Sequence, residues 1–492
     1  MEAKMSKIRQ EKFGKSISFV GRRDEMKYIT DATKTGEAGI LVVYGRRRVG
    51  KTELIEHVLQ DRNLIKLEGV EDGDTKAQMV RVLYQLSKAF DDKYVTNMKF
   101  NTWLELFDFI ASKISVGKWT LYLEEVQWLA EYKNELISDL KYVWDNTLRR
   151  NPDLLLVLCG SSPSFMQNQV VHSKALYNRS IYELNLREFS LKETETMLGN
   201  RSYREVMDAY LTVGGIPEYL KRVKKHSSIR LGICEESFKK DSYFSNEKKR
   251  IFISSFATNV HYQEIVDFLS QVKFASKKDI EKHLNTRGGG NLTNVLRDLE
   301  LCGFIDRYVP YQMDSNSSLV RYCIADSYLR FYFKFIAPIA DRIQQGDYSQ
   351  APLHALNNES YQKWLGLSFE RFCRKHSQMI ANIIGFSAVR YKSGAFFNRT
   401  TIKKEEGYQI DLIFDRADHV TTICEIKYTK SKTGTEIVEE FERKLRLLTD
   451  VGSKTIEKVL ITASGATDAL LATAYFDRII TLEDIFSVNK NL

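Results

Sequence analysis

Three strongly apolar runs in the first third of the chain predict buried strands. The first, Ile40 to Tyr44, is rich in β-branched and aliphatic residues, as expected for a strand covered on both faces. A stretch with helical character, 53–60, follows it after a glycine-containing loop. The runs 120–123 and 153–162 have the same apolar character. Such strands, separated by helical segments, favour an α/β domain built on a parallel sheet.

From about residue 262 onward, the pattern changes to two helical stretches, a glycine turn, a third helical stretch and two strands, which is the order of a winged helix. The third helical stretch has an apolar face formed by Leu292, Val295, Leu296 and Leu299. Its polar face carries Asn291, Thr293, Asn294 and Arg297. Those side chains can reach bases or phosphates in a major groove. Because Asp298 and Glu300 offset the charge of Arg297, a winged helix that only packs against the rest of the protein and relays its state is equally open.

Near the C-terminus, charged residues lie inside apolar patterns. Glu370 lies beside the apolar face of a helical stretch, Asp411 lies within a strand-like run, and Glu425 and Lys427 lie within the next run. Alternate residues of a strand share a face, so Glu425 and Lys427 point the same way, and a neighbouring strand can bring Asp411 beside them. This set suits metal-dependent phosphodiester cleavage, with Asp411 and Glu425 holding Mg²⁺ and Lys427 orienting water or offsetting charge. A solvated charged face and a nuclease fold without activity are the alternatives.

Length and composition set the broad class of the protein. At 492 residues the chain exceeds a single core, and a prior of about 150 residues per domain predicts three or four modules. With 43% hydrophobic and 28% charged residues and only 6 prolines, the composition is globular. No apolar segment approaches the length of about 20 residues that a bilayer requires, so we expect no membrane partner and a cytoplasmic location. The net charge of +9 permits a nucleic-acid partner without requiring one.

The loop after the first apolar run, residues 45–52, has the spacing of a phosphate-binding loop. Gly45 and Gly50 allow the backbone to wrap around an anion with its N–H groups pointing inward. Lys51 can reach the β- and γ-phosphates, and the Thr52 hydroxyl can hold Mg²⁺. A predicted strand before the loop and a predicted helix after it give the motif its required context. We therefore predict a nucleoside triphosphate site, with ATP and Mg²⁺ as cofactors.

Residues near the ends of two later strands complete the expected site. Glu124 and Glu125 follow the run 120–123, where the first carboxylate would organise Mg²⁺ and the second would polarise the attacking water. The usual first residue is aspartate, so Glu124 leaves hydrolysis more open than binding. The run 153–162 ends in hydroxyls suited to sensing the γ-phosphate. Arg179, in a short polar turn, is a candidate for stabilising transition-state charge in its own subunit or a neighbouring one, and a surface arginine is the alternative.

Together these motifs resemble the archaeal and bacterial P-loop ATPases of the AAA+/STAND type that carry a C-terminal nuclease-like domain. The resemblance is carried by the box Gly21-Arg22-x-x-Glu25, the basic phosphate loop, the acidic pair, the Cys-Gly-Ser-Ser strand end, the turn with Arg179 and the segment 213–220. In such ATPases the Gly-Arg box and a Gly-x-Pro turn are thought to flank the nucleotide base. The resemblance therefore implies adenine recognition near Gly21, Arg22 and Pro217.

The C-terminal set of charged residues resembles the core of the restriction-endonuclease-like, PD-(D/E)XK, superfamily. Asp411 and the strand motif Glu425-x-Lys427 match the central motif of that core. Glu370 fits its upstream helix carboxylate, as a further metal ligand, and Lys444 fits its later helix cation. The resemblance implies a nuclease-like domain that acts on nucleic acid with the help of a metal ion.

We therefore expect an α/β multidomain protein. Its parts are a P-loop parallel-sheet ATPase core at 1–190, a helical lid at 191–250, a winged helix at 251–345 and a C-terminal α/β restriction-endonuclease-like domain at 346–492. ATP binding would close the core and lid, the winged helix would relay this change, and the C-terminal site would meet nucleic acid, which we expect to be DNA. An ATP-dependent switch or scaffold with an inactive nuclease-like domain, and an ATP-responsive DNA-binding regulator, are the alternatives. A homo-oligomer is also open.

Overall fold

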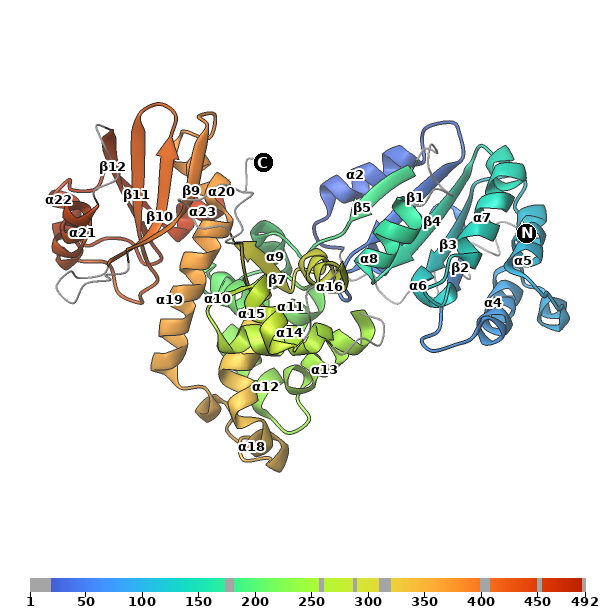
Figure 1. Cartoon of the computed structure of the whole chain (residues 1–492), viewed down its shortest axis with the longest axis horizontal. Coiled ribbons are helices and arrows are strands. Elements are labelled where there is room, and N and C mark those ends of the chain that lie inside the picture. The colour runs from blue at the N-terminus through green and yellow to red at the C-terminus, as the bar shows by residue number, and fades with distance from the viewer. Residues whose placement is uncertain are drawn as a thin grey trace. The chain divides into compact units, whose positions relative to one another are not determined.

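The structure is a computed structural model of the chain, and it forms two compact units (Figure 1). The first unit comprises residues 1–187 and the second comprises residues 188–492. The residues described are 19–172, 181–255, 261–285, 290–308, 320–398, 408–448 and 454–488. Within these ranges, no helix is both long enough and apolar enough to cross a lipid bilayer.

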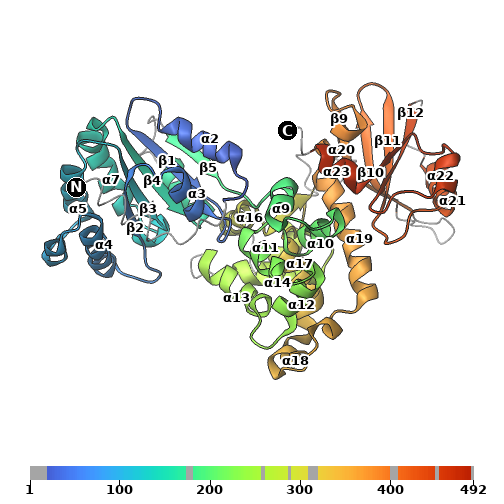
Figure 2. The same cartoon turned by 180° about the vertical axis from the view of Figure 1, so that it is seen from behind.

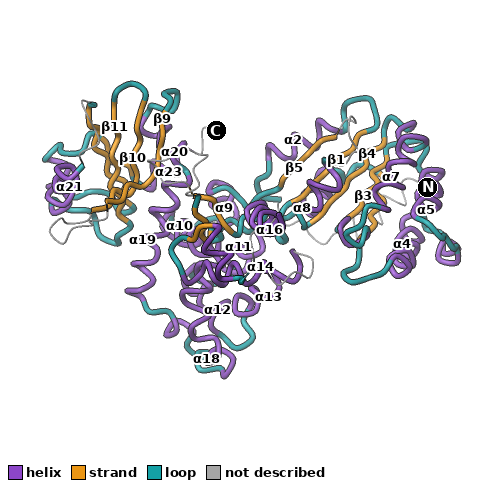
Figure 3. The backbone as a smooth tube through the Cα atoms, viewed as in Figure 1, coloured by secondary structure: helices purple, strands orange, loops and turns teal. Residues whose placement is uncertain are grey.

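The first unit is built on a five-stranded parallel sheet with the order β2-β3-β4-β1-β5. The strands are β1 (Gly39–Tyr44), β2 (Asn63–Glu68), β3 (Trp119–Glu124), β4 (Leu154–Gly160) and β5 (Ile181–Asn185). Parallel neighbours need crossover connections, which helices supply on both sides of the sheet (Figure 3). The three apolar runs of the sequence are thus the three adjacent strands β3, β4 and β1, and the predicted parallel sheet is confirmed.

Helices of the first unit cover both faces of this sheet. They are α2 (Arg23–Ala32), α3 (Lys51–Val58), α4 (Thr75–Ala89), α5 (Trp103–Lys113), α6 (Val126–Leu129), α7 (Glu135–Asn146) and α8 (Pro163–Phe165). Every residue of β1 is buried. Ile40 and Val42 pack in the cluster that contains apolar residues of α4, α5 and α7, whereas Leu41 and Val43 are buried on the other face. This strand, held on both faces, fixes the start of the phosphate loop.

The second unit begins with a run of five helices. They are α9 (Leu191–Leu198), α10 (Tyr203–Val213), α11 (Pro217–Lys224), α12 (Ile229–Phe238) and α13 (Tyr243–Ser255). Local signals set their starts: the side chain of Ser190 accepts from the backbone of Glu193, whose side chain bonds back, and Pro217 occupies the first turn of α11. The glycines Gly214 and Gly215 separate α10 from α11, as the sequence predicted for a turn.

Three helices and a small antiparallel sheet follow, and the short strand β6 between the first two helices was not predicted. The helices are α14 (His261–Gln271), α15 (Lys277–His283) and α16 (Gly290–Leu301), and the sheet has the order β6 (Ala275–Ser276), β8 (Arg321–Ile324), β7 (Ile305–Tyr308). The predicted apolar face of α16 is buried: Leu292, Val295, Leu296 and Leu299. On its other face, Lys277 of α15 donates a 2.7 Å hydrogen bond to the Thr293 hydroxyl.

An aromatic core joins these segments to the helix that follows. Helix α17 (Ser327–Phe331) continues into the wider turns of η4 (Tyr332–Ile336). Tyr328 lies 5.5 Å, between ring centroids, from both Tyr219 of α11 and Phe244 of α13. Phe331 packs at 5.9 Å against Trp364 of α19 (Asn358–Lys375). These rings come from the four helices α11, α13, α17 and α19. The helices of the middle of the chain and the first long helix of the C-terminal part therefore share one core.

The C-terminal part carries a mixed sheet with the order β13-β12-β11-β10-β9 (Figure 2). Its strands are β9 (Tyr391–Asn398), β10 (Tyr408–Arg416), β11 (Val420–Lys427), β12 (Thr455–Thr462) and β13 (Arg478–Ile480). The first three pair antiparallel, and β11, β12 and β13 pair parallel. The remaining helices of this unit are α18 (Ala340–Gln345), α20 (Ser377–Ile384), α21 (Glu436–Leu447), α22 (Asp468–Ala472) and α23 (Leu482–Val488), with short turns η5 (Ala337–Ile339) and η6 (Pro352–Ala355).

Candidate functional site

The phosphate loop links the end of β1 to the start of α3. Gly45 has φ 149° and Gly50 has φ 90°, so both adopt backbone conformations that favour glycine. A Cβ atom on Gly45 would lie 2.1 Å from the carbonyl oxygen of Leu186. Leu186 is fixed in turn, because its N–H donates to the Tyr44 carbonyl at 2.7 Å. The first glycine is therefore required by its packing against the chain after β5.

Lys51 is the first residue of α3 and lies almost buried in the loop, with 8% of its surface exposed. Its Nζ donates to the carbonyl of Gly45 at 2.8 Å and to that of Arg46 at 3.1 Å. The free N–H groups at the start of a helix and an ammonium group beside them attract an anion. The arrangement suits the phosphates of a nucleotide, which can replace these carbonyls as acceptors.

Glu124, the last residue of β3, lies next to the loop and is 8% exposed. Its Oε1 accepts hydrogen bonds from the Thr52 hydroxyl and, at 2.9 Å, from the Tyr122 hydroxyl. Its Oε2 lies 2.7 Å from Nζ of Lys66 on β2. Burial alone would raise the pKa of Glu124, but the hydrogen bonds from Lys66 and Thr52 outweigh it, and the pKa lies below its usual value. Glu124 is therefore ionised at neutral pH.

Glu125 starts the short helix α6 with φ 51°, a left-handed conformation. Its Oε2 accepts from the Ser161 hydroxyl at 2.7 Å, from the Ser161 N–H at 3.1 Å and from Gln127 Nε2 at 2.6 Å. Nε of Arg47, in the phosphate loop, lies 3.9 Å from its Oε1. The Ser161 hydroxyl, one of the two predicted at the end of β4, thus donates a hydrogen bond to Glu125, the second carboxylate of the acidic pair.

Arg22 connects the Gly-Arg box to the phosphate loop. Gly21 and Arg22 both have positive φ, 72° and 61°. The Arg22 guanidinium is 4% exposed; it pairs with Glu25 at 3.0 Å and donates to the Val49 carbonyl at 3.0 Å and the Arg187 carbonyl at 2.7 Å. The Arg22 guanidinium therefore bonds the backbone of the phosphate loop and the backbone of the chain after β5.

Two predicted residues are not part of this geometry. Pro217 belongs to the second unit, at the start of α11. Arg179 lies outside the described residues. Their roles in nucleotide binding remain predictions.

Three side chains at this site were missed by the sequence analysis: Lys66, Tyr122 and Arg47. Lys66 is half-buried between the buried residues Ile65 and Leu67 of β2, and a lysine among apolar residues is a detectable signal, because an ammonium group that is partly removed from water favours a partner. Its partner Glu124 belongs to the neighbouring strand, and that pairing follows from the strand order, which the local pattern does not contain. Arg47 also packs over the Trp128 ring, 4.8 Å from its centroid.

The donor set at the loop fits a magnesium ion. Thr52 and Glu124 bring a hydroxyl and an ionised carboxylate oxygen into direct contact, and hard oxygen ligands of this kind suit Mg²⁺, which keeps several waters. Across the described residues there is no group of three or more His, Cys, Asp or Glu side chains arranged to hold a metal ion. The predicted metal ligands Glu370, Asp411 and Glu425 are therefore not grouped in this way either.

A second cluster of charged side chains lies on the C-terminal sheet. Asp411 of β10 accepts from the Ile426 N–H at 3.1 Å through Oδ2. Glu425 of β11 is 1% exposed. Nζ of Lys444 on α21 lies 2.9 Å and 2.7 Å from its two oxygens, and Nζ of Lys427 lies 3.0 Å from Oε1. Two predicted cations thus reach one predicted carboxylate.

Glu370 of α19 is connected to this cluster through Gln409. The Gln409 amide donates to Glu370 Oε2 at 3.5 Å and to Asp411 Oδ1 at 3.2 Å. Burial, followed by the charges of Glu425 and Glu370, raises the pKa of Asp411 to about 7. Neighbouring carboxylates that raise the pKa of Asp411 are the electrostatic setting in which a bound cation is favourable.

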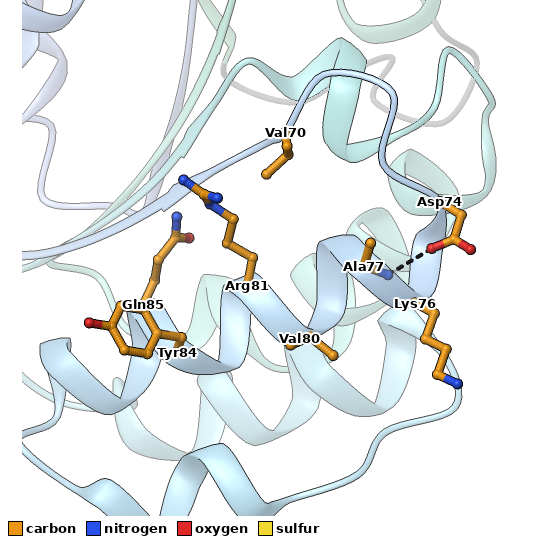
Figure 4. A pocket seen from close by; sticks show the side chains of 8 residues that line it. All are labelled: Val70, Asp74, Lys76, Ala77, Val80, Arg81, Tyr84 and Gln85. Carbon is orange, nitrogen blue, oxygen red and sulfur yellow. Dashed lines mark hydrogen bonds between the residues drawn. The ribbon is translucent and has the colours of Figure 1, made fainter.

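The first unit also has an open cavity of about 890 Å³ along α4 (Figure 4). Its lining consists of Val70, Asp74, Lys76, Ala77, Val80, Arg81, Tyr84 and Gln85. None of the predicted site residues contributes to it. The side chains in this cavity are mostly solvent-facing residues of one helix, so it is separate from the nucleotide site.

The fold and the loop define the class of the first unit as a P-loop ATPase domain. Residues 19–223 match the model of the family described as an ATPase domain predominantly from Archaea. The match begins at the Gly-Arg box and includes the phosphate loop, the acidic pair and the turn before α11.

Two archaeal relatives are similar in sequence. An uncharacterized protein of Methanocaldococcus jannaschii is 25% identical over 450 residues, which cover 87% of this chain and 92% of that protein. An uncharacterized ATP-binding protein of the same organism is 35% identical over 48 residues, which cover 10% of this chain and 81% of that protein.

Two solved structures are similar at low sequence identity. The Walker-type ATPase of Pyrococcus abyssi has a TM-score of 0.46 and 15% identity, with 64% of this chain and 96% of that chain covered. The Aeropyrum pernix ORC2 protein in its ADPNP–ADP complexes has a TM-score of 0.44 and 12% identity, with 68% and 98% covered.

Proposed function

We propose that the protein binds and hydrolyses ATP at the loop of its first unit. The observation that carries this proposal is the contact of Thr52 with Glu124 beside the nearly buried Lys51. An ammonium group, a helix N-terminus, a hydroxyl and an ionised carboxylate converge at this point, and each suits one part of a magnesium–triphosphate complex. Adenine would lie near Gly21, Arg22 and Pro217, as the family resemblance implies.

In this mechanism the side chains of the chain have separate roles. Lys51 exchanges its loop carbonyls for phosphate oxygens and offsets their charge. Thr52 and Glu124 would hold Mg²⁺, which would supply charge neutralisation for the phosphates when bound. Glu125 orients the attacking water and accepts its proton, with Ser161 holding the carboxylate in place. Arg179 stabilises the charge of the transition state.

Substitution of Lys51 tests the binding step. We expect Lys51→Ala to weaken ATP binding at least about tenfold, because a charge-assisted contact to phosphate is lost. Lys76→Ala, which removes an exposed lysine of α4 in the same unit, is the matched control. Binding of a fluorescent ATP analogue measures both. Equal affinity in the Lys51 variant and in the control would exclude this site.

We further propose the four-part organisation of the chain: an ATPase core at 1–190, a helical lid at 191–250, a winged helix at 251–345 and a restriction-endonuclease-like domain at 346–492. The order of α14, α15 and α16 followed by β7 and β8 supports the winged helix. Three antiparallel strands continued by two parallel ones, with Asp411 and Glu425 on adjacent central strands, support the nuclease-like domain. Nucleotide state in the core would control the activity of the C-terminal site.

The proposed C-terminal activity is metal-dependent cleavage of DNA. Asp411 and Glu425 are adjacent buried carboxylates that fit a divalent ion, with Glu370 connected to them through Gln409, and Lys427 would orient water. Labelled single- and double-stranded DNA and RNA, incubated with Mg²⁺ or Mn²⁺ and with or without ATP, test it beside Glu425→Ala. Cleavage that is lost in the variant supports a nuclease, whereas equal cleavage by both proteins excludes the site.

A switch or scaffold is the second candidate, and one observation favours it. Both oxygens of Glu425 are already held by Lys444, so the buried charge is balanced without a metal ion. In that case ATP would control partner binding, and the C-terminal part would only dock. An ATP-responsive DNA-binding regulator would instead use α16. DNA affinity with a steep salt dependence but no cleavage favours the regulator over the scaffold.

A further inference from the structure

Three arginines gather along one side of α19. Arg371 and Arg374 lie one turn apart on this helix. Arg330 comes from α17, and its guanidinium donates a 2.7 Å hydrogen bond to the hydroxyl of Ser368, one turn before Arg371. Arg330 also lies 5.6 Å from the ring centroid of Trp364 on the same helix. The tertiary fold of the second unit therefore adds a third guanidinium to the two that the sequence of α19 supplies.

The positive charges of this arginine cluster are poorly balanced. Within the described part of the chain, neither Arg330 nor Arg371 forms an ion pair, and Arg371 also makes no hydrogen bond through its side chain. Both side chains are only partly exposed. Burial, followed by the charge of Arg371, lowers the pKa of Arg330 to about 9. Glu370 on the same helix and Asp306 of β7 both attract Arg371, but neither forms an ion pair with it.

The arginine cluster borders the carboxylates of the C-terminal site. Arg374 donates to the backbone carbonyl of Asp411 at 3.0 Å and lies 3.5 Å from Glu370. The three guanidinium groups therefore continue from a cluster of carboxylates and lysines, with Arg374 between the two sets. An anion that extends over more than one residue length could contact the arginines and the carboxylate site together.

We propose that Arg330, Arg371 and Arg374 bind phosphate groups of a nucleic-acid strand that enters the Asp411–Glu425 site. This proposal rests on the proposed function of the C-terminal site and names how its partner is held. A guanidinium group presents a planar fork of N–H donors that matches phosphate oxygens, and such contacts position a strand without reading its sequence. A bound phosphate would also relieve the repulsion between Arg330 and Arg371.

Binding of labelled oligonucleotides to the full-length protein tests the proposal. We expect Arg371→Ala to weaken binding about tenfold at low salt and to reduce the salt dependence by about one phosphate contact. Lys363→Ala is the matched control, because Lys363 is an exposed cation on the same helix, two turns earlier. We expect its affinity to stay within about twofold of the unmodified protein.

Thermal unfolding separates this role from a structural one. Because Arg371 makes no hydrogen bond or ion pair within the described residues and its burial disfavours the charged form, we expect Arg371→Ala to unfold at the same temperature as the unmodified protein or higher. Arg371→Lys, which keeps the charge but loses the fork, should give intermediate oligonucleotide affinity. Loss of affinity together with a lowered melting temperature in both variants would overturn the proposal.

The remaining outcomes distinguish this proposal from the proposed function. If oligonucleotide binding depends on Arg371 but no metal ion gives cleavage, the result supports the phosphate-binding arginines and contradicts the proposed nuclease activity. Cleavage that needs Glu425, with unchanged affinity in Arg371→Ala, supports the nuclease and overturns the strand site. Inorganic phosphate is the other source of the same chemistry. If Arg371→Ala weakens the binding of inorganic phosphate but not of oligonucleotides, the cluster is a small-anion site and the proposal is overturned.

Discussion

Lys66, Thr52 and Tyr122 hold the two oxygens of Glu124 from three directions. The longer side chain of glutamate, compared with the usual aspartate, reaches both the loop hydroxyl and the lysine of the neighbouring strand. One oxygen therefore faces Thr52 of the phosphate loop, while the other is held by Lys66. The glutamate at position 124, where aspartate is usual, therefore has an ion-pair partner of its own, Lys66.

Removal of Lys66 should affect the metal ion more than the nucleotide. Side chains that orient metal ligands typically contribute tenfold or more to metal affinity. We expect Lys66→Met to raise the Mg²⁺ concentration for half-maximal ATP hydrolysis about tenfold, with metal-free ATP affinity unchanged. Titration of Mg²⁺ in an ATPase assay measures this, with Lys76→Met as the control. An unchanged Mg²⁺ requirement would show that Lys66 only balances charge.

At the scale of elements, substitutions of two glycines test how closely the phosphate loop packs against the chain after β5. Gly36 and Gly45 both have positive φ, but an added Cβ meets no atom within 4 Å at Gly36, whereas it meets Leu186 at Gly45. We expect Gly36→Ala to cost about 1 kcal/mol and Gly45→Ala at least about 2 kcal/mol more, because the second change also overpacks the backbone. Urea denaturation midpoints measure the difference. Equal midpoints would contradict the close packing.

The contact between β11 and α21 includes one buried ion pair, between Glu425 and Lys444. Lys444 and Glu425 are both buried, so Lys444→Met leaves a carboxylate whose remaining partner is Lys427. Breaking a buried pair typically costs about 3–5 kcal/mol, whereas replacing both partners costs little. We therefore expect Lys444→Met to destabilise the protein by about 3 kcal/mol and the double variant with Glu425→Gln to recover most of it. If chemical denaturation shows additive losses, the pair does not interact as described.

The elements that the sequence predicted are those with strong periodic patterns. The run Ile40 to Tyr44 is β1, and the apolar positions of α16 are buried, because local hydrophobic spacing alone determines them. The adjacency of Asp411 and Glu425 was also predictable, because two successive strands carry them. These features can be predicted because the residues involved are close in the chain or lie on strands that follow one another.

The contacts that sequence reasoning did not find join elements distant in the chain. Lys66 meets Glu124 because β2 lies beside β3, and Arg330 meets α19 because an aromatic core brings α17 onto that helix. No local pattern contains the strand order or the packing of these helices. Arg371 was not singled out from the sequence for the same reason, because its proposed role in binding phosphate depends on its neighbour Arg330.

At the scale of the whole molecule, the residues on either side of the boundary at 187 are bonded to their own units. The Arg187 carbonyl accepts from Arg22 at 2.7 Å, within the first unit. The Phe189 N–H donates to the Gly215 carbonyl at 2.7 Å, within the second. Arg22 also bonds the phosphate loop at Val49, so its side chain connects the loop with the boundary.

Limited proteolysis tests this connection, since trypsin cleaves after arginine and Arg187 is exposed. We expect ATP to slow cleavage after Arg187 in the unmodified protein. In Arg22→Ala, cleavage should be faster and independent of ATP, because the scissile carbonyl has lost its donor. Mass spectrometry of the fragments over time gives the rates. Equal protection by ATP in both proteins would show that Arg22 does not connect loop and boundary.

We propose that the acidic pair beside the phosphate loop hydrolyses ATP, with Glu125 as the group that activates water. The most direct measurement compares ATP binding and steady-state ATP turnover in the unmodified protein and in Glu125→Gln. We predict unchanged ATP affinity and a loss of turnover of about 100-fold or more, the usual contribution of a general base. Turnover at the unmodified rate in Glu125→Gln would contradict this account.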